Sequence, residues 1–231
     1  MSKPTRVAAL IGVCALTACT GASNPSTVPT PSPSPTSSPS DSVPEGWELV
    51  QVDDPGFALA MPDGWITISG EDVTNTGIFE QLAEDNPEAA AAMEQARTAI
   101  ESGQMSFLGV ETGRRTIEAG FAANLNVVHV PDPGSFSAEE VAAQMKVALP
   151  LQIPGAKVVE TETTDVPAGE AAIVRTHWTL KIGTESLALD LTQYMILTGG
   201  EGFILSFTAP RDTIGDYRDV WVDIAESFSA D

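Results

Sequence analysis

Two neighbouring stretches decide the fold: AIVRTHWTLKI at residues 172–182 and LALDLTQYMIL at residues 187–197. In each stretch, apolar residues alternate with polar ones. This alternation is typical of antiparallel strands that bury one face and leave the other polar. The short segment between them contains Gly183-Thr184, which favours a two-residue hairpin loop. The sequence therefore predicts a long β-hairpin.

The length of that loop fixes which residues lie opposite each other. A two-residue loop pairs Leu180 with Leu187 and Trp178 with Leu189, which keeps apolar side chains together.

The next turn contains Gly199-Gly200. If only one face is apolar, a loop of odd length is needed to bring Met195 opposite Phe203. We therefore predict three or five loop residues there.

The remaining chain alternates between strand and helix patterns. Strands are expected at 47–52, 57–61, 65–68, 105–111, 122–130, 156–166 and 203–209, and helical patterns at 76–102, after Ser137 and after Asp212. Asn86-Pro87 predicts a break in the first helix, and Gly113-Arg114-Arg115 predicts a turn. Ser137-Ala-Glu-Glu140 is a capping box, Pro150 and Pro154 are expected to end that helix, and Asp212 is expected to cap the last one. The predicted fold class is α+β, a mainly antiparallel β-sheet flanked by helices.

The N-terminus has the layout of an export signal. Lys3 and Arg6 precede the apolar run Val7 to Leu16, which is too short to span a bilayer. Leu16-Thr17-Ala18-Cys19 then resembles the lipobox of bacterial lipoproteins. The resemblance implies that cleavage follows Ala18 and that Cys19 carries S-diacylglycerol and N-palmitoyl groups. The alternative is an ordinary secretory signal with an incidental cysteine.

The segment after the lipobox is rich in proline. Residues 20–44 contain seven prolines, eight serines and four threonines, and no lysine or arginine. Such a composition cannot bury enough apolar surface to fold, so it predicts a semi-rigid tether. O-glycosylation of the tether and a proline-motif docking site are alternatives. The expected organisation is a signal peptide at 1–18, a lipidated tether at 19–44 and one globular domain at 45–231.

The charge and cysteine content exclude several classes of function. The net charge of −21 argues against nucleic-acid binding and against adsorption on an anionic membrane surface. Both cysteines, Cys14 and Cys19, precede residue 20, so a disulfide framework or a cysteine-based metal site in the domain is excluded.

Motifs of catalysis and metal binding do not occur in the predicted domain. The sequence has no His-Glu-x-x-His pair, Gly-x-Ser-x-Gly elbow or Gly-rich phosphate loop. His129 is expected to be a hydrogen-bonded structural histidine, and the run Asp212, Asp216, Asp219 and Asp223 a solvated helix face. We therefore expect no metal, no cofactor and no enzymatic activity; an enzyme with a non-sequential constellation is the alternative.

A family resemblance adds to this interpretation. Gly56-Phe-Ala-Leu-Ala-Met-Pro-Asp-Gly-Trp65 resembles the "Gly-Phe-x-x-x-x-Pro-x-x-Trp" opening of the Mog1/PsbP-like superfamily. Asn124 to Val128 resembles its asparagine-bearing strand, and Phe203 to Pro210 with Glu226-Ser-Phe228 resembles its closing elements. Behind a lipobox and a stalk, this layout is similar to actinobacterial lipoproteins of the LpqN type. The resemblance implies an antiparallel sheet between helical layers and a binding or assembly role.

These observations predict a non-enzymatic binding or assembly module, held by its lipid anchor on the outer side of the cytoplasmic membrane. Its partner would be an unknown envelope protein or a lipid or glycan ligand. The alternative is a lipid or small-molecule carrier, which needs an apolar pocket of roughly 300 Å³ or more between sheet and helices.

The hairpin register also predicts a candidate binding face. The face comprises Arg175, His177, Lys181, Asp190 and Tyr194, with Ser206 and Thr208 expected beside them. His177 is expected opposite Asp190. The alternative is that these side chains form only the solvated face of the sheet.

Overall fold

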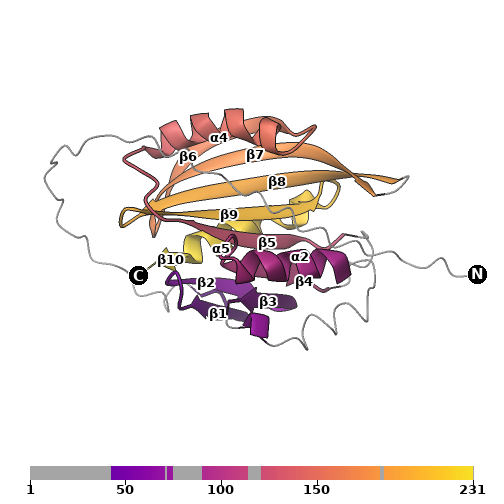
Figure 1. Cartoon of the computed structure of the whole chain (residues 1–231), viewed down its shortest axis with the longest axis horizontal. Coiled ribbons are helices and arrows are strands. Elements are labelled where there is room, and N and C mark those ends of the chain that lie inside the picture. The colour runs from indigo at the N-terminus through magenta and orange to yellow at the C-terminus, as the bar shows by residue number, and fades with distance from the viewer. Residues whose placement is uncertain (1–42, 71, 75–89, 114–120, 183–184, 231) are drawn as a thin grey trace, which may run out of the picture.

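The computed structural model describes residues 43–70, 72–74, 90–113, 121–182 and 185–230. The strands are β1 (Trp47–Val52), β2 (Phe57–Pro62), β3 (Trp65–Ser69), β4 (Phe107–Glu111), β5 (Asn124–Val130), β6 (Lys157–Val166), β7 (Gly169–Ile182), β8 (Glu185–Thr198), β9 (Glu201–Pro210) and β10 (Ser229–Ala230). The helices are α2 (Ala90–Glu101), α4 (Ala138–Gln152) and α5 (Arg218–Ser227), with short 3-10 turns η2 (Asp72–Thr74) and η3 (Ile214–Asp216) (Figure 1).

The described strands form two antiparallel sheets. The larger has the order β3-β4-β5-β9-β8-β7-β6, and the smaller the order β1-β2-β10. One face of the large sheet packs against the small sheet and α5, through a core that includes Phe57, Phe203, Phe207 and Trp221. The opposite face carries α4 at one side and α2 at the other. The structure confirms a mainly antiparallel sheet flanked by helices.

The predicted hairpin is confirmed by the strand register. Leu180 lies opposite Leu187 and Trp178 opposite Leu189, as a two-residue loop requires. The other expected strands are also present, with ends that differ by at most two residues.

The predicted length of the next loop was wrong. Gly199 and Gly200 alone form the loop, with Thr198 paired to Glu201. Both glycines have positive φ, 59° and 88°, which is the backbone of a tight hairpin turn.

The prediction failed because it assumed that β9 has one apolar face. Phe203 packs into the core beside α5, whereas Ile204 packs with Met195 into the core beneath α4. Since both faces are covered, an even loop that pairs Met195 with Ile204 leaves no apolar side chain in water.

Two helix boundaries also differ from expectation. The capping box is confirmed, because Ser137 Oγ accepts from the Glu140 amide and Glu140 accepts from the Ser137 amide. Pro150, however, lies inside α4, which ends at Gln152. A proline in the last turn removes a single backbone hydrogen bond, and the fully buried Leu149 holds that turn on the sheet.

The last helix begins later than predicted. Asp212 does not cap it, because η3 intervenes and α5 starts only at Arg218, with Tyr217 at its cap and no side-chain capping bond. The first predicted helix is described only as α2. Residues 75–89, including Asn86-Pro87, lie outside the described residues, as do Arg114 and Arg115.

Candidate functional site

The register places the five residues of the predicted binding face on the same side of the β7–β8 hairpin. Their surroundings differ, however, and one of them lies in the core. Tyr194 is buried, with its ring edge-on to Phe207 at 5.8 Å. Burial raises the pKa of the Tyr194 phenol, and the nearby Arg175 partly offsets this. Tyr194 is therefore a core residue.

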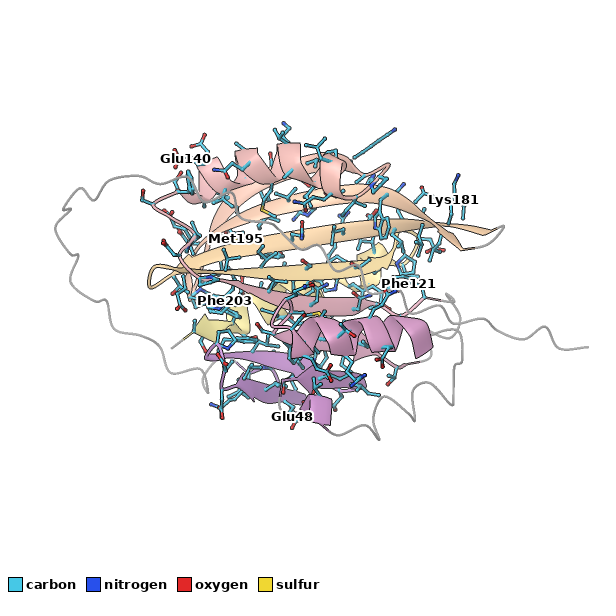
Figure 2. The ribbon with its side chains drawn as sticks, in the orientation of Figure 1. Glu48, Phe121, Glu140, Lys181, Met195 and Phe203 are labelled. Atoms are coloured by element: carbon cyan, nitrogen blue, oxygen red, sulfur yellow. The ribbon has the colours of Figure 1, made fainter. Side chains whose placement is uncertain are left out.

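Arg175 is occupied by carboxylates of the edge strand. Its guanidinium lies 2.6 Å from Glu160 and 2.8 Å from Glu162, both on β6. Partial burial works against the charge, but the hydrogen bond to Glu160 and the two carboxylates raise the pKa of Arg175 above its ordinary value. Lys181 is exposed at the far end of the β7–β8 hairpin, at the opposite end of the sheet from Phe203 (Figure 2).

His177 and Asp190 do meet, as predicted. His177 Nε2 lies 3.4 Å from Asp190 Oδ1, and the register pairs the two residues. A third member was missed: Arg211 Nε donates to the same Asp190 oxygen at 2.8 Å, and Arg211 Nη2 donates to the Leu189 carbonyl. Arg211 directly follows Pro210, which pairs with Leu189, so the correct β8–β9 register would have found it.

The four aspartates from Asp212 to Asp223 are exposed, as predicted for a solvated surface. The ring of His129 stacks on Phe203 with centroids 5.0 Å apart. Its buried Nε2 makes no hydrogen bond among the described residues, although Glu201 Oε2 lies 3.4 Å away. The hydrogen bond expected for His129 is therefore absent at Nε2.

A row of uncharged polar side chains crosses the centre of the sheet on the opposite face. Gln193 pairs with Ser206, and Ser206 pairs with Asn126, across β8, β9 and β5. One step along the strands, Thr208 pairs with Asn124. Together with Thr176 of β7, these residues are between 0% and 5% exposed. We call the set the polar row: Asn124, Asn126, Thr176, Gln193, Ser206 and Thr208.

The polar row lies between the areas that the two helices cover. Val174, Met195 and Ile204 pack beneath α4 on one side of it. Leu108 and Val110 pack with α2 on the other side. The row therefore lies mainly on β8, β9 and β5, where they run between α4 and α2, with Thr176 on the neighbouring β7 (Figure 1).

Few hydrogen bonds satisfy this row. Gln193 Nε2 donates to Ser206 Oγ at 2.9 Å, and Asn124 Nδ2 donates to the Ala122 carbonyl at 3.1 Å. Four buried side-chain atoms of the row have no hydrogen-bond partner among the described residues: Asn124 Oδ1, Asn126 Nδ2, Thr176 Oγ1 and Gln193 Oε1. The row thus offers both donors and acceptors, and it contains no titratable group. Its chemistry suits a neutral ligand that both donates and accepts hydrogen bonds.

Sequence analysis missed this row because it predicted an odd number of residues in the loop between β8 and β9. A three- or five-residue loop would have turned Ser206 and Thr208 toward His177, whereas the two-residue loop turns them toward Gln193 and Asn124. The available signal was the Asn124-x-Asn126 spacing, which places two amides on one strand face.

A cleft of about 460 Å³ opens at the end of the large sheet where β5 ends. Its wall mixes polar residues, among them Asp53, Asp54 and His129, with apolar ones such as Ile100 and Met105. The volume exceeds the roughly 300 Å³ expected for a carrier, but the carboxylates are poor neighbours for an acyl chain.

Among the described residues, no helix is long and apolar enough to cross a bilayer, and no group of three His, Cys, Asp or Glu could hold a metal ion. Ala18 and Cys19 lie outside the described residues.

No family model matches the chain, and no curated protein matches it. Several solved structures are similar in fold. A PsbP from Synechocystis shares 10% identity over 80% of this chain and 93% of its own, with a TM-score of 0.48. LpqN of Mycobacterium tuberculosis, a protein involved in cell envelope biogenesis, shares 14% identity over 79% and 89%, with a TM-score of 0.43. The Ran-binding protein Mog1p of Saccharomyces cerevisiae shares 8% identity over 80% and 95%, with a TM-score of 0.46.

Proposed function

We propose that the chain is a non-enzymatic envelope lipoprotein that binds an uncharged ligand while anchored to the outer side of the cytoplasmic membrane. The lipobox-like segment ending at Cys19 supports the anchor, because two acyl groups on one residue meet the requirement for stable membrane attachment. The proline-rich segment 20–44 would then hold the domain at 45–231 away from the bilayer.

The observation that carries the binding function is the set of unpartnered atoms in the polar row. An unsatisfied buried polar group costs about 1–3 kcal/mol, so apolar side chains of similar shape would make a more stable sheet. A ligand that donates to Asn124 Oδ1 and Gln193 Oε1 and accepts from Asn126 Nδ2 would supply the absent bonds. Side chains that weaken a fold in this way are expected where binding requires them.

The chemistry of the row supports binding over catalysis. Amides and hydroxyls of this kind can orient a ligand, but they do not take up or release protons near neutral pH. His177 and Asp190, which could exchange protons, lie on the other face of the sheet. The ligand of the row would therefore be held and released unchanged, as for a glycan or another neutral envelope molecule.

The carrier function is the less supported alternative. An acyl chain in the cleft would bury Asp53 and Asp54 against apolar surface, which is unfavourable for charged groups.

Native mass spectrometry of the full-length chain, purified in detergent from its own envelope, tests the proposal. The wild type should retain an uncharged small molecule, and Asn126→Leu should lose it while remaining folded. Arg175→Ala, on the opposite face, is the matched control and should retain it. Equal retention by Asn126→Leu and the wild type, or no retained molecule in any sample, would contradict the proposal.

A further inference from the structure

The cleft at the end of the sheet is a second site, separate from the polar row. It is bounded by the β1–β2 turn at Asp53 and Asp54, by the end of β3 at Ser69, by Ile100 in the last turn of α2, and by Gly103 just after that helix. Its volume of about 460 Å³ lies within the range of small-ligand sites, roughly 300–1,000 Å³.

Two carboxylates line this cleft on the side of the β1–β2 turn. Asp53 and Asp54 line it directly, and both side chains are exposed. A third carboxylate, Asp72, lies just behind the lining, where its Oδ2 accepts hydrogen bonds from the amide and the hydroxyl of Ser69 at 2.9 Å. The C-terminal end of α2 adds a partial negative charge that no basic residue in its last turn neutralises.

Little positive charge offsets these carboxylates among the described lining residues. Among the described residues that line the cleft, none is a lysine or an arginine. His129 already has a carboxylate beside it, because Glu201 Oε2 lies 3.4 Å from its Nε2. The field within the cleft therefore favours a cationic ligand.

The apolar part of the wall adds a second requirement. Val52, Ile100, Met105 and Pro131 line the cleft together with the charged residues. A bare metal ion would gain nothing from these side chains, whereas a hydrocarbon stem would bury surface against them. The ring of His129 is fixed on Phe203 and offers a flat wall to such a stem.

We propose that this cleft binds an organic ammonium group on a short apolar stem, as presented by a lysine side chain or by a small alkylamine. The apolar wall takes the stem, and the carboxylates of Asp53 and Asp54 take the ammonium. The site is independent of the polar row, so either one can fail without the other.

An NMR titration of the full-length chain in non-ionic detergent tests this proposal. The probe is Nα-acetyl-lysine N-methylamide, followed through the backbone amides of Gly70 and Gly103, which line the cleft. These amides should shift saturably, while the norleucine analogue, which has a similar apolar stem but lacks the ammonium, should bind at least about tenfold more weakly. Pentylammonium distinguishes the source: comparable binding indicates a free amine, and weaker binding indicates a partner's lysine.

Variants separate the cleft from general surface charge. The double change Asp53→Asn and Asp54→Asn should weaken binding of the lysine probe about tenfold or more. Asp132→Asn removes an exposed carboxylate outside the lining and should change the affinity less than twofold. Equal weakening by the control, equal binding of norleucine, or no saturable shift would overturn the proposal. The side-chain amide of Asn126 should not respond to this probe, which keeps the outcome distinct from that of the proposed function.

Discussion

Gln193 donates a hydrogen bond to Ser206 Oγ across β8 and β9, and Gln193 Oε1 remains without a partner among the described residues. The two residues lie between the areas covered by α4 and α2, where a β-sheet protein normally places aliphatic side chains. A buried polar atom without a partner lowers the free energy of unfolding, and this cost can be measured at single residues of the row.

Thr176 offers the simplest measurement of that cost. It is fully buried, and its Oγ1 has no partner among the described residues. Thr176→Val keeps the shape and removes the unsatisfied hydroxyl, so the free energy of unfolding should rise by about 1 kcal/mol. Thr179→Val, at an exposed position of the same strand, is the control and should change it by less than about 0.5 kcal/mol. A loss of stability in Thr176→Val, measured by denaturant unfolding, would show that the hydroxyl is satisfied.

The Gly199-Gly200 turn makes a second prediction. Gly200 has a φ of 88°, which an L-residue with a side chain adopts only with strain. Gly200→Ala should therefore lower the free energy of unfolding by about 1–2 kcal/mol. Gly215→Ala is the matched control, since that glycine has no positive φ and an added methyl group there would meet no atom within 4 Å. If both variants unfold at the same denaturant concentration, the tight turn is wrong, and so is the register that creates the polar row.

A third prediction concerns Asp190. Its carboxylate is nearly buried and holds Arg211 at 2.8 Å. Asp190→Ala should lower the free energy of unfolding by about 1–3 kcal/mol, because it removes the carboxylate to which Arg211 Nε donates and, among the described residues, leaves the guanidinium with the Leu189 carbonyl alone. Glu160→Ala removes an exposed ion-pair partner of Arg175 and should cost less than about 1 kcal/mol. Equal losses of stability, measured by thermal unfolding at neutral pH, would contradict the distinction between the nearly buried Asp190 and the exposed Glu160.

The anchor is tested by labelling. Cys19→Ala should abolish incorporation of a fatty-acid analogue and leave the signal peptide in place. Cys14→Ala, which removes the other cysteine, should label like the wild type. Labelled Cys19→Ala protein, detected on a gel after metabolic labelling, would exclude Cys19 as the attachment site.

The alternating pattern was enough to predict the hairpin, because each strand of β7 and β8 has one face of mixed polarity that sets the register. The pattern failed at β9, where Phe203 and Ile204 are both buried and periodicity carries no information about the loop. Whether the β8–β9 loop has an odd or an even number of residues decides whether Ser206 faces His177 or Gln193. The polar row therefore could not be predicted from the sequence, although its residues occupy alternating positions along the strands.

The predicted binding face shows which contacts the sequence could predict and which it could not. The sequence placed His177 opposite Asp190, because that contact depends on one hairpin. It could not show that Glu160 and Glu162 occupy Arg175, or that α5 and the small sheet bury Tyr194, because those contacts join segments far apart in the chain.

The most direct test of the central claim follows the side-chain amides of the polar row. The 15N spectrum of the full-length chain in detergent is recorded while a small-molecule extract of the envelope is added, after ion-exchange resin has removed its charged components. The account predicts that the side-chain amides of Asn126 and Gln193 shift together and saturate, while those of the exposed Gln144 and Gln152 on α4 stay in place. Unchanged Asn126 and Gln193 signals, or equal shifts at all four amides, would contradict it.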